Sequence, residues 1–320
     1  MSAPGEPALP LQQLQSVLSP AGSAADTIAS LSWGLFALMA LIFIGVMALL
    51  AWAVSRRAGG QPVRPLRWIV GGGVVFPLVV LAGLFGASHW RTPGWLVPPP
   101  PGALIVGITA HLWWWEVRYR DPATGQDITL ANELRLPVGR PVWLGLSSPD
   151  VIHSFWVPAL AGKVDMVPGR VNHLLVQARQ PGVYRGQCAE YCGDQHARMA
   201  LHVVATPPAE FNAWLAAQAR PAASPASPLL ERGRQAFMAQ RCNACHTVRG
   251  VAGESRLGPD LTHVGSRLYL GAGTLRNQPG AMAHWVSDVQ ALKPGARMPS
   301  SNDMDAGTLQ ALAAYLEHLQ

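Results

Sequence analysis

The first third of the chain contains two long apolar stretches without charged side chains. Neither residues 28–54 nor residues 68–90 include an Asp, Glu, Lys or Arg. As a helix rising ~1.5 Å per residue, either stretch is long enough to cross a ~30 Å hydrocarbon core. The alternative is a pair of buried helices in a soluble protein, but such helices rarely exceed ~20 residues without a charge. The pattern therefore predicts two transmembrane helices and contact with a lipid bilayer.

The charges beside these stretches predict their orientation. The connecting segment, residues 55–67, holds four arginines and no acid, whereas the residues before 28 hold Glu6 and Asp26 and no base. Because basic residues collect on the cytoplasmic side, the connection is expected inside the cell. The N-terminus and everything after residue 90 are then expected outside, on the periplasmic side of a bacterial inner membrane. A cleaved signal peptide would need a basic region before the first stretch, and the residues there include none.

The pattern changes to short runs of β-branched and aromatic residues after a proline-rich hinge at residues 98–101. Five such runs are separated by Pro and Gly and are predicted to be strands; they begin at residues 103, 127, 169, 182 and 200. Strands of this length with regular turns between them predict an all-β sandwich with one packed core. We expect this domain to occupy residues 98–219.

A further domain follows a linker. Residues 208–220 have a short helical pattern, and residues 220–228 read RPAASPASP, a semi-stiff linker by composition. Helical patterns at residues 229–240 and 304–319 begin and end the remaining chain. The predicted parts are the N-terminal segment with the two membrane helices at 1–97, the β domain at 98–219, the linker at 220–228 and a helical domain at 229–320.

Composition excludes several functional classes. Only 13% of the residues are charged, and the net charge of +6 comes from basic residues scattered without a basic run. Disordered, collagen-like and nucleic-acid-binding proteins have other compositions, so no nucleic-acid partner is expected. The four cysteines fall into two pairs, Cys188 with Cys192 and Cys242 with Cys245. These pairs carry most of the functional information.

The first cysteine pair belongs to a set of soft metal ligands. His196 and Met199 follow the pair in the same segment, and His153 comes earlier in the chain. Copper favours such a set of thiolate, imidazole and thioether. A single copper needs one Cys, whereas two cysteines with two histidines offer two bridging sulfurs and one nitrogen for each of two metals. The alternatives are a disulfide and a tetrahedral zinc site, in which Met199 would have no role.

The second cysteine pair lies in a haem-attachment motif. Residues 242–246 read Cys-Asn-Ala-Cys-His, the signature of covalently bound c-type haem. The two thiols take the haem vinyl groups as thioethers and leave the imidazole of His246 under the iron. A Pro- and Gly-rich loop carries Met298, the best candidate for the sixth ligand, whereas Met282 and Met304 are expected to be packing residues.

These segments resemble two known families. WWWEVRY at residues 113–119, DVIHSFWVP at 150–158 and QCAEYCGDQHARM at 187–199 resemble subunit II of the haem-copper cytochrome c oxidases. That resemblance covers about residues 29–208 and implies a cupredoxin-like domain with a dinuclear copper A centre. Residues 229–320 resemble class I cytochrome c, an all-α fold. Together they look like the caa3 type of oxidase subunit II, which has a fused cytochrome c domain.

The resemblance implies a role for each ligand candidate. Cys188 and Cys192 would bridge the coppers, His153 and His196 would be terminal ligands, and Met199 and the backbone carbonyl of Glu190 would be axial. The Glu190 side chain is also implied to reach a magnesium ion at the boundary with subunit I. Trp113 matches the position at which electrons enter in that family, although the same residue can serve ordinary strand packing.

One departure from the family concerns proton uptake. Relatives often carry a glutamate near the start of the second membrane helix, whereas residues 65–73 contain no acid. If protons enter there, another subunit must supply the carboxylate. Alternatively, the chain belongs to a divergent branch.

The favoured function is the subunit through which electrons enter a proton-translocating cytochrome c oxidase. Electrons from a donor cytochrome would reach haem c, then copper A, then subunit I, with subunit III as a further partner; entry directly at Trp113 stays open. The alternative is the copper A subunit of a nitric oxide reductase. A self-contained reductase would need its own metal cluster, and the remaining seven histidines do not pair at ligand spacing. A copper chaperone would have no use for a covalent haem.

Overall fold

The computed structural model describes residues 15–56, 64–91, 98–253 and 255–320. By its internal contacts the chain divides into residues 26–99 and a second unit of residues 1–25 and 100–320. Each unit is described by itself. Residues 1–14, 57–63 and 92–97 carry part of the charge pattern and of the predicted boundary at 97, and they lie outside the described residues. The orientation and the domain boundaries stay predictions.

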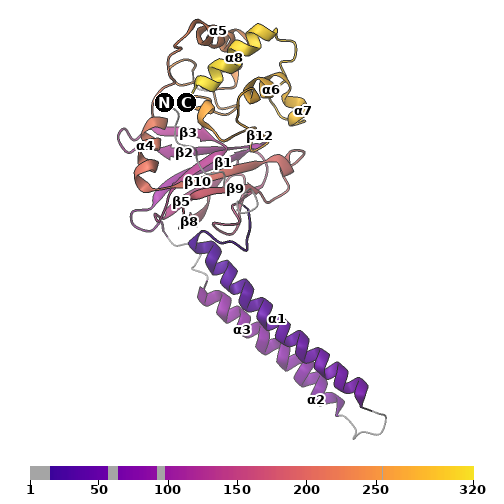
Figure 1. Cartoon of the computed structure of the whole chain (residues 1–320). Coiled ribbons are helices and arrows are strands. Elements are labelled where there is room, and N and C mark those ends of the chain that lie inside the picture. Colours follow the sequence, from indigo (N-terminus) through magenta and orange to yellow (C-terminus); the bar gives the residue numbers. More distant parts are fainter. Residues whose placement is uncertain (1–14, 57–63, 92–97, 254) are drawn as a thin grey trace. The chain divides into compact units, whose positions relative to one another are not determined.

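The first unit consists of two long apolar helices (Figure 1). Helix α1 (Ser23–Ser55) is followed by α2 (Pro65–Val70), the π-helical turn η2 (Gly71–Val75) and α3 (Phe76–Arg91), which run on continuously. In η2 the Phe76 amide donates to the Gly71 carbonyl. This wider turn lies directly before Pro77, whose ring clashes with the preceding turn of a regular helix. Both helical segments are long and apolar enough to cross a membrane.

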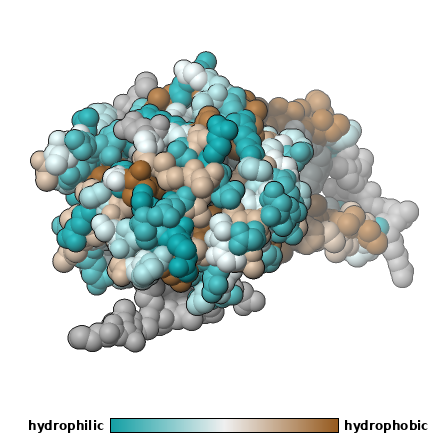
Figure 2. Space-filling model, turned by 90° about the horizontal axis from the view of Figure 1, so that it is seen from above, coloured by the Kyte–Doolittle hydropathy of each residue, from teal (hydrophilic) through white to brown (hydrophobic). Residues whose placement is uncertain are grey.

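The surfaces of these helices suit lipid rather than a protein core. Leu41, Phe43, Leu78 and Phe85 are each more than half exposed. On the face drawn in Figure 2 the hydrophobic residues of the helices contrast with the mostly hydrophilic surface of the other unit. None of the most apolar part of either helix is buried, so these helices do not fit the alternative of two buried helices in a soluble protein.

The β domain is a sandwich of two five-stranded sheets, with strand orders β3-β2-β1-β5-β8 and β4-β10-β9-β6-β7. The strands of the first sheet are β1 (Leu104–His111), β2 (Trp114–Arg120), β3 (Asp127–Ala131), β5 (Val142–Ser147) and β8 (Asn172–Val176). Those of the second are β4 (Glu133–Pro137), β6 (His153–Trp156), β7 (Val164–Met166), β9 (Gly182–Cys188) and β10 (Ala200–Thr206). The predicted all-β sandwich is confirmed.

Alternation of side chains along the strands builds the core between the sheets. Every second residue of β1 is buried, namely Val106, Ile108 and Ala110. Trp115 of β2 meets Phe155 of β6 edge to face, with ring centroids 5.7 Å apart, and so joins the two sheets. Helix α4 (Pro208–Gln218) covers one end of this core with buried apolar residues.

The segment before α1 packs on this domain. The Ala21 amide donates to the Ala159 carbonyl at 2.7 Å, and the Ala25 amide donates to the Leu160 carbonyl at 3.2 Å. Gly22 is needed there because a Cβ atom would lie 2.2 Å from the Leu160 carbonyl oxygen. Residues 21–25, which belong to the same unit as the sandwich, are therefore tied to it by backbone hydrogen bonds.

The helical domain is built on the crossing of α5 (Pro228–Ala239) and α8 (Ala306–His318). Ser227 caps α5 by accepting the Leu230 amide, with Pro228 in the first turn. The shorter elements between them are η4 (Cys242–Ala244), η5 (Val264–Ser266), β11 (Tyr269–Leu270), β12 (Leu275–Arg276), α6 (Ala281–Ser287) and α7 (Val289–Leu292). A core around Phe237 and Tyr315 forms under the crossing. The domain is mainly helical, as expected.

Candidate functional site

Strand pairing brings the first group of ligand candidates together. In the pairing of β6 with β9, Phe155 lies opposite Cys188, so His153 at the start of β6 lies near the end of β9. The loop from residue 189 to 199 then carries Cys192 and, in the short helix η3 (His196–Arg198), His196. Two rigid strands and one loop thus hold both cysteines and both histidines at one edge of the sandwich.

The sulfur and nitrogen atoms face one another in pairs. The two Sγ atoms of Cys188 and Cys192 are 3.7 Å apart. Cys188 Sγ is 3.9 Å from His153 Nδ1, and Cys192 Sγ is 3.7 Å from His196 Nδ1. The ligand atoms of His153, Cys188 and Cys192 all lie within 4.8 Å of one another. Each histidine therefore serves one side of a pair of sulfurs.

Two further donors complete the group. Met199 Sδ lies 4.0 Å from Cys192 Sγ, and the Glu190 carbonyl oxygen lies 3.1 Å from Cys188 Sγ. Both thiols are free, and their separation is far beyond the ~2.05 Å of a disulfide bond. Since a tetrahedral zinc site would leave the thioether and the carbonyl without a role, the donor set fits two coppers better than zinc.

The two thiols of this group are linked by a hydrogen bond, with the Sγ atoms 3.7 Å apart. Hydrogen bonding with Cys192 lowers the pKa of Cys188, and the same contact raises the pKa of Cys192. A pair that interacts this strongly loses its protons in two steps that belong to the pair. Because metals bind thiolates, any proton held by this pair would be released when copper binds.

Asp150 holds the buried histidine from behind. Asp150 Oδ1 is 2.8 Å from His153 Nε2, and Oδ2 accepts the Leu112 amide at 2.9 Å. Although burial raises the pKa of Asp150, the hydrogen bonds from His153 and the backbone lower it overall. The proton of His153 is thereby kept on Nε2, and Nδ1 faces the sulfur as a metal ligand. Sequence patterns give Asp150 no role, because only its position behind the His153 ring reveals one.

The three consecutive tryptophans have three different environments. Trp115 is fully buried in the core, and Trp114 stacks on His111 with ring centroids 4.4 Å apart. Trp113 instead donates from Nε1 to the Cys192 carbonyl at 2.9 Å. A Cβ on Gly193 would lie 3.1 Å from the Trp113 indole. The ring therefore packs directly against the loop of residues 189–199, called the ligand loop below. Trp113 thus lies in the turn between β1 and β2 and contacts this loop, so strand packing does not account for it.

The second group of candidates lies at the start of the helical domain. His246 Nδ1 donates to the Pro259 carbonyl at 2.7 Å, which leaves Nε2 free for a metal. Burial lowers the pKa of His246, so its imidazole is neutral at pH 7, the form that binds iron. A Cβ on Gly258 would lie 2.7 Å from the His246 ring, so only glycine fits there. With the free thiols of Cys242 and Cys245 alongside, these residues fit an attached haem.

The methionine candidates differ in burial. Met282 is buried in the helical-domain core, and both Met298 and Met304 are partly buried at its edge. The loop of Met298 is held by Gln290, whose Nε2 donates to the carbonyls of Ala296 and Met298, each at 2.7 Å. Met298 therefore lies on a loop with a fixed backbone beside the core.

Comparison with known proteins gives the same two domains. Residues 121–206 match the family described as cytochrome c oxidase subunit II, periplasmic domain, and residues 230–320 match cytochrome c. Cytochrome c oxidase subunit 2 of Alkalihalophilus pseudofirmus is 38% identical over 217 residues, which cover 68% of this chain and 61% of that protein. The corresponding protein of Bacillus subtilis is 30% identical over 231 residues, covering 68% of this chain and 63% of that protein.

The solved structure of the periplasmic domain of subunit II from Bradyrhizobium japonicum is 29% identical, with a TM-score of 0.35, and covers 38% of this chain and 97% of that one. The chain spans just over six-tenths of the length of the two curated relatives, 61% and 63%. The first family implies copper A and the second implies haem. These matches make the chain a member of the cytochrome c oxidase subunit II family over residues 121–206, joined to a member of the cytochrome c family over residues 230–320.

Proposed function

We propose that the chain is the subunit through which electrons enter a haem-copper terminal oxidase. It would receive electrons from a donor cytochrome at a haem held by His246 and deliver them through copper A to a catalytic partner subunit. The observation that carries this proposal is the pair of sulfurs, each facing one histidine nitrogen at 3.9 or 3.7 Å. A dinuclear copper centre shares one electron between two metals and so keeps reorganisation on electron transfer small.

The residues of the β domain would hold that centre in a stiff, dry frame. We propose Cys188 and Cys192 as bridges, His153 and His196 as terminal ligands, and Met199 and the Glu190 carbonyl as axial ligands. Cys188, Cys192, His153 and Met199 are each at most 5% exposed, so water is kept from the ligand atoms. Asp150 fixes the ring orientation of His153 through its hydrogen bond at 2.8 Å.

The residues of the helical domain would hold haem c covalently. Each thiol of Cys242 and Cys245 would add across one vinyl group, with the proton going to the vinyl carbon. His246 would bind the iron through Nε2, and Met298 through its thioether. A His and Met pair raises the haem potential, which suits a carrier that feeds an oxidant. The hydrogen bond from His246 to the Pro259 carbonyl supports the role of this imidazole.

The membrane part gives the proposed placement. The two candidate spans would anchor the chain in a bacterial inner membrane, with residues 55–67 in the cytoplasm and both large domains on the periplasmic side. Subunits I and III are the proposed partners, and another subunit would supply the proton-pathway carboxylate that residues 65–73 lack. The Glu190 side chain, beside the 75% exposed Tyr191, is proposed to reach magnesium at the subunit I boundary.

The proposal can be tested on the purified complex. The oxidised protein is expected to give the EPR hyperfine pattern of one electron shared by two coppers, and reduction is expected to reveal the α-band of a c-type haem. Cys192→Ser should abolish the shared pattern and leave the haem band, whereas Cys245→Ser should disturb haem attachment and leave the copper signal. Copurification with partner subunits and oxygen consumption are also expected. A single-copper pattern, or a complex that consumes nitric oxide and not oxygen, would contradict the proposal.

A further inference from the structure

Lys293 is a buried lysine at the boundary between the β domain and the helical domain, which belong to the same unit. It follows α7, and only 4% of it is exposed. Its Nζ donates to the carbonyls of Trp113 at 3.0 Å, Arg198 at 2.8 Å and Gly271 at 3.0 Å. Trp113 and Arg198 belong to the β domain, and Gly271 belongs to the helical domain. One side chain thus joins the two domains.

Burying this amine is costly unless its donors are satisfied. Burial, together with the nearby Arg198 guanidinium, lowers the pKa of Lys293 to about 7. A lysine ammonium has three N–H donors, and the three carbonyl oxygens accept one each. Lys293 is in neither hydrophobic core. Lys293 has all three carbonyl acceptors only when the β domain and the helical domain are docked. These hydrogen bonds therefore stabilise the docked arrangement.

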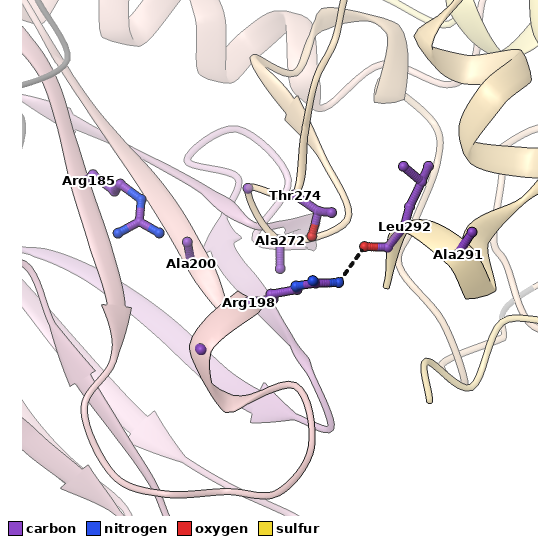
Figure 3. Close-up of a pocket in the computed structure, with 9 residues that line it drawn as sticks. Arg185, Arg198, Ala200, Ala272, Thr274, Ala291 and Leu292 are labelled. Carbon is purple, nitrogen blue, oxygen red and sulfur yellow. Dashed lines mark hydrogen bonds between the residues drawn. The ribbon is translucent and has the colours of Figure 1, made fainter. Parts of the chain in front are cut away.

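The residues on both sides of Lys293 accept hydrogen bonds from the ligand loop. Arg198 Nη1 donates to the Leu292 carbonyl at 2.8 Å, across a cleft of about 410 Å³ (Figure 3). Gln195 Nε2 donates to the Pro294 carbonyl. The Ala200 amide, next to Met199, donates to the Ala272 carbonyl at 3.0 Å. Gln195, Arg198 and Ala200, which surround His196 and Met199 in the sequence, are therefore tied to the helical domain.

The same segment leads to the proposed iron ligand. Gln290 Nε2 donates to the carbonyls of Ala296 and Met298, each at 2.7 Å, and Gln290 Oε1 accepts the Gly295 amide at 3.1 Å. The Met298 loop is thereby fastened to α7, and α7 is followed by Lys293. On the other side, Trp113 accepts Lys293 through its carbonyl and donates to the Cys192 carbonyl through its indole. Lys293 is the link between these two bonded segments.

We propose that Lys293 is a positioning residue for electron transfer within the chain: it holds the loop of Met298 against the loop of Cys192 and so sets the separation of haem and copper A. The proposal rests on the proposed function. The step concerned would be the transfer of one electron from the haem that Cys242, Cys245 and His246 would hold, which would be oxidised, to the copper centre that Cys188 and Cys192 would hold, which would be reduced. No bond forms or breaks and no proton moves. Because electron tunnelling falls steeply with distance, a looser docking slows the step.

The test uses the full chain with haem and copper bound. A photoreductant pulse reduces the haem, and optical absorption follows the electron to copper. Lys293→Met keeps the length of the stem and removes the donors. We expect it to slow the transfer about tenfold or more. Lys163→Met is the matched control, since it removes the same charge from an exposed lysine of the β domain, and it should transfer as fast as the wild type.

A second readout reports docking without electron transfer. The Ala200 amide is bonded across the boundary, so its hydrogen exchange should speed up in Lys293→Met and stay unchanged in Lys163→Met. The haem and copper potentials and the EPR signal should match the wild type in both variants. Loss of either cofactor in Lys293→Met would assign the lysine to folding and overturn the proposal.

A Lys293→Met rate within about twofold of the wild type would overturn the inference. A wild type in which no electron passes from haem to copper would instead refute the proposed function itself.

Discussion

The crossing of α5 and α8 gives the sharpest structural prediction, the effect of Gly233→Ala. A Cβ at this position would lie 2.0 Å from the Ala311 carbonyl oxygen and 2.5 Å from the Tyr315 Cβ. Ordinary contacts of a Cβ begin at 3.4 Å. Because the nearest atom belongs to the backbone of α8, no side-chain rotation relieves the clash. The helices would have to move apart by on the order of 1 Å.

The size of the effect follows from what lies under the crossing. Phe237 and Tyr315 are fully buried there, with ring centroids 6.3 Å apart, and separating the helices loosens their packing. Overpacking of a core costs ~1–3 kcal/mol or more, whereas Ala in place of Gly within a helix gains ~1 kcal/mol. Since the clash is with backbone, we expect the upper part of that range and a net loss of about 2 kcal/mol in the free energy of unfolding of the helical domain.

Denaturant titration of the full chain in detergent, followed by haem absorption, measures this loss. Gly307→Ala is the control, because its Cβ would meet only Asp305 Oδ1, at 3.4 Å. Replacing this second helical glycine with alanine should leave the free energy of unfolding unchanged or raise it slightly. If Gly233→Ala unfolds at the same denaturant concentration as the wild type, the helices do not cross this closely and the packing argument is refuted.

Three further predictions concern the cofactor sites and the domain boundary. Asp150→Asn removes the charge behind His153 and should weaken copper binding about 10- to 100-fold in competition with a chelator; unchanged affinity would contradict the tautomer argument. Met298→Leu should remove the thioether-to-iron charge-transfer band and lower the haem potential, whereas Met282→Leu should retain both; the reverse result would reassign the ligand. At the domain boundary, His202 of β10 stacks on Tyr269 of the helical domain, with ring centroids 4.0 Å apart. Burial lowers the pKa of His202 from 6.5 to about 4, so between these pH values the unfolded chain binds more protons than the folded chain. The stability from neutral His202 is then complete above pH 6.5 and falls by about 3 kcal/mol towards pH 4. The free energy of unfolding of His202→Gln should depend less on pH between 6.5 and 4 than that of the wild type. An equally steep dependence would show that His202 is not the group responsible.

The sequence alone was sufficient wherever the chemistry is local. Residues 242–246 hold two thiols and an imidazole at spacings that hardly depend on the rest of the chain. Cys188, Cys192 and His196 likewise share one strand end and loop, and the length of an uncharged apolar stretch is by itself a measure of its reach across a bilayer. For the same reason the helical hairpin and the alternating strands of a sandwich could be predicted, since each depends on a short repeating pattern.

Sequence patterns did not predict the turns between strands whose residues include no Pro or Gly. The run beginning at residue 103 was predicted as one strand, yet it turns at Leu112 and continues as β2 antiparallel to β1. The run beginning at residue 127 likewise turns at Asn132, between β3 and β4, whereas the break between β4 and β5 is marked by Pro137, Gly139 and Pro141. Neither the bend at Leu112 nor the one at Asn132 has a Pro or Gly, so composition could not place them. Only the pairing with neighbouring strands decides where such a chain turns.

Roles that depend on distant residues were decided by the tertiary structure alone. His153 comes 35 positions before Cys188, and only the pairing of β6 with β9 places its nitrogen beside that sulfur. The role of Asp150 follows from the same placement, because its carboxylate bonds the other nitrogen of the His153 ring. Lys293 is 180 positions from Trp113, and nothing in its own loop distinguishes it from a solvated lysine. Spacing along the chain determines contacts only over a few residues, whereas strand pairing, burial and packing between domains determine which groups far apart in the sequence meet.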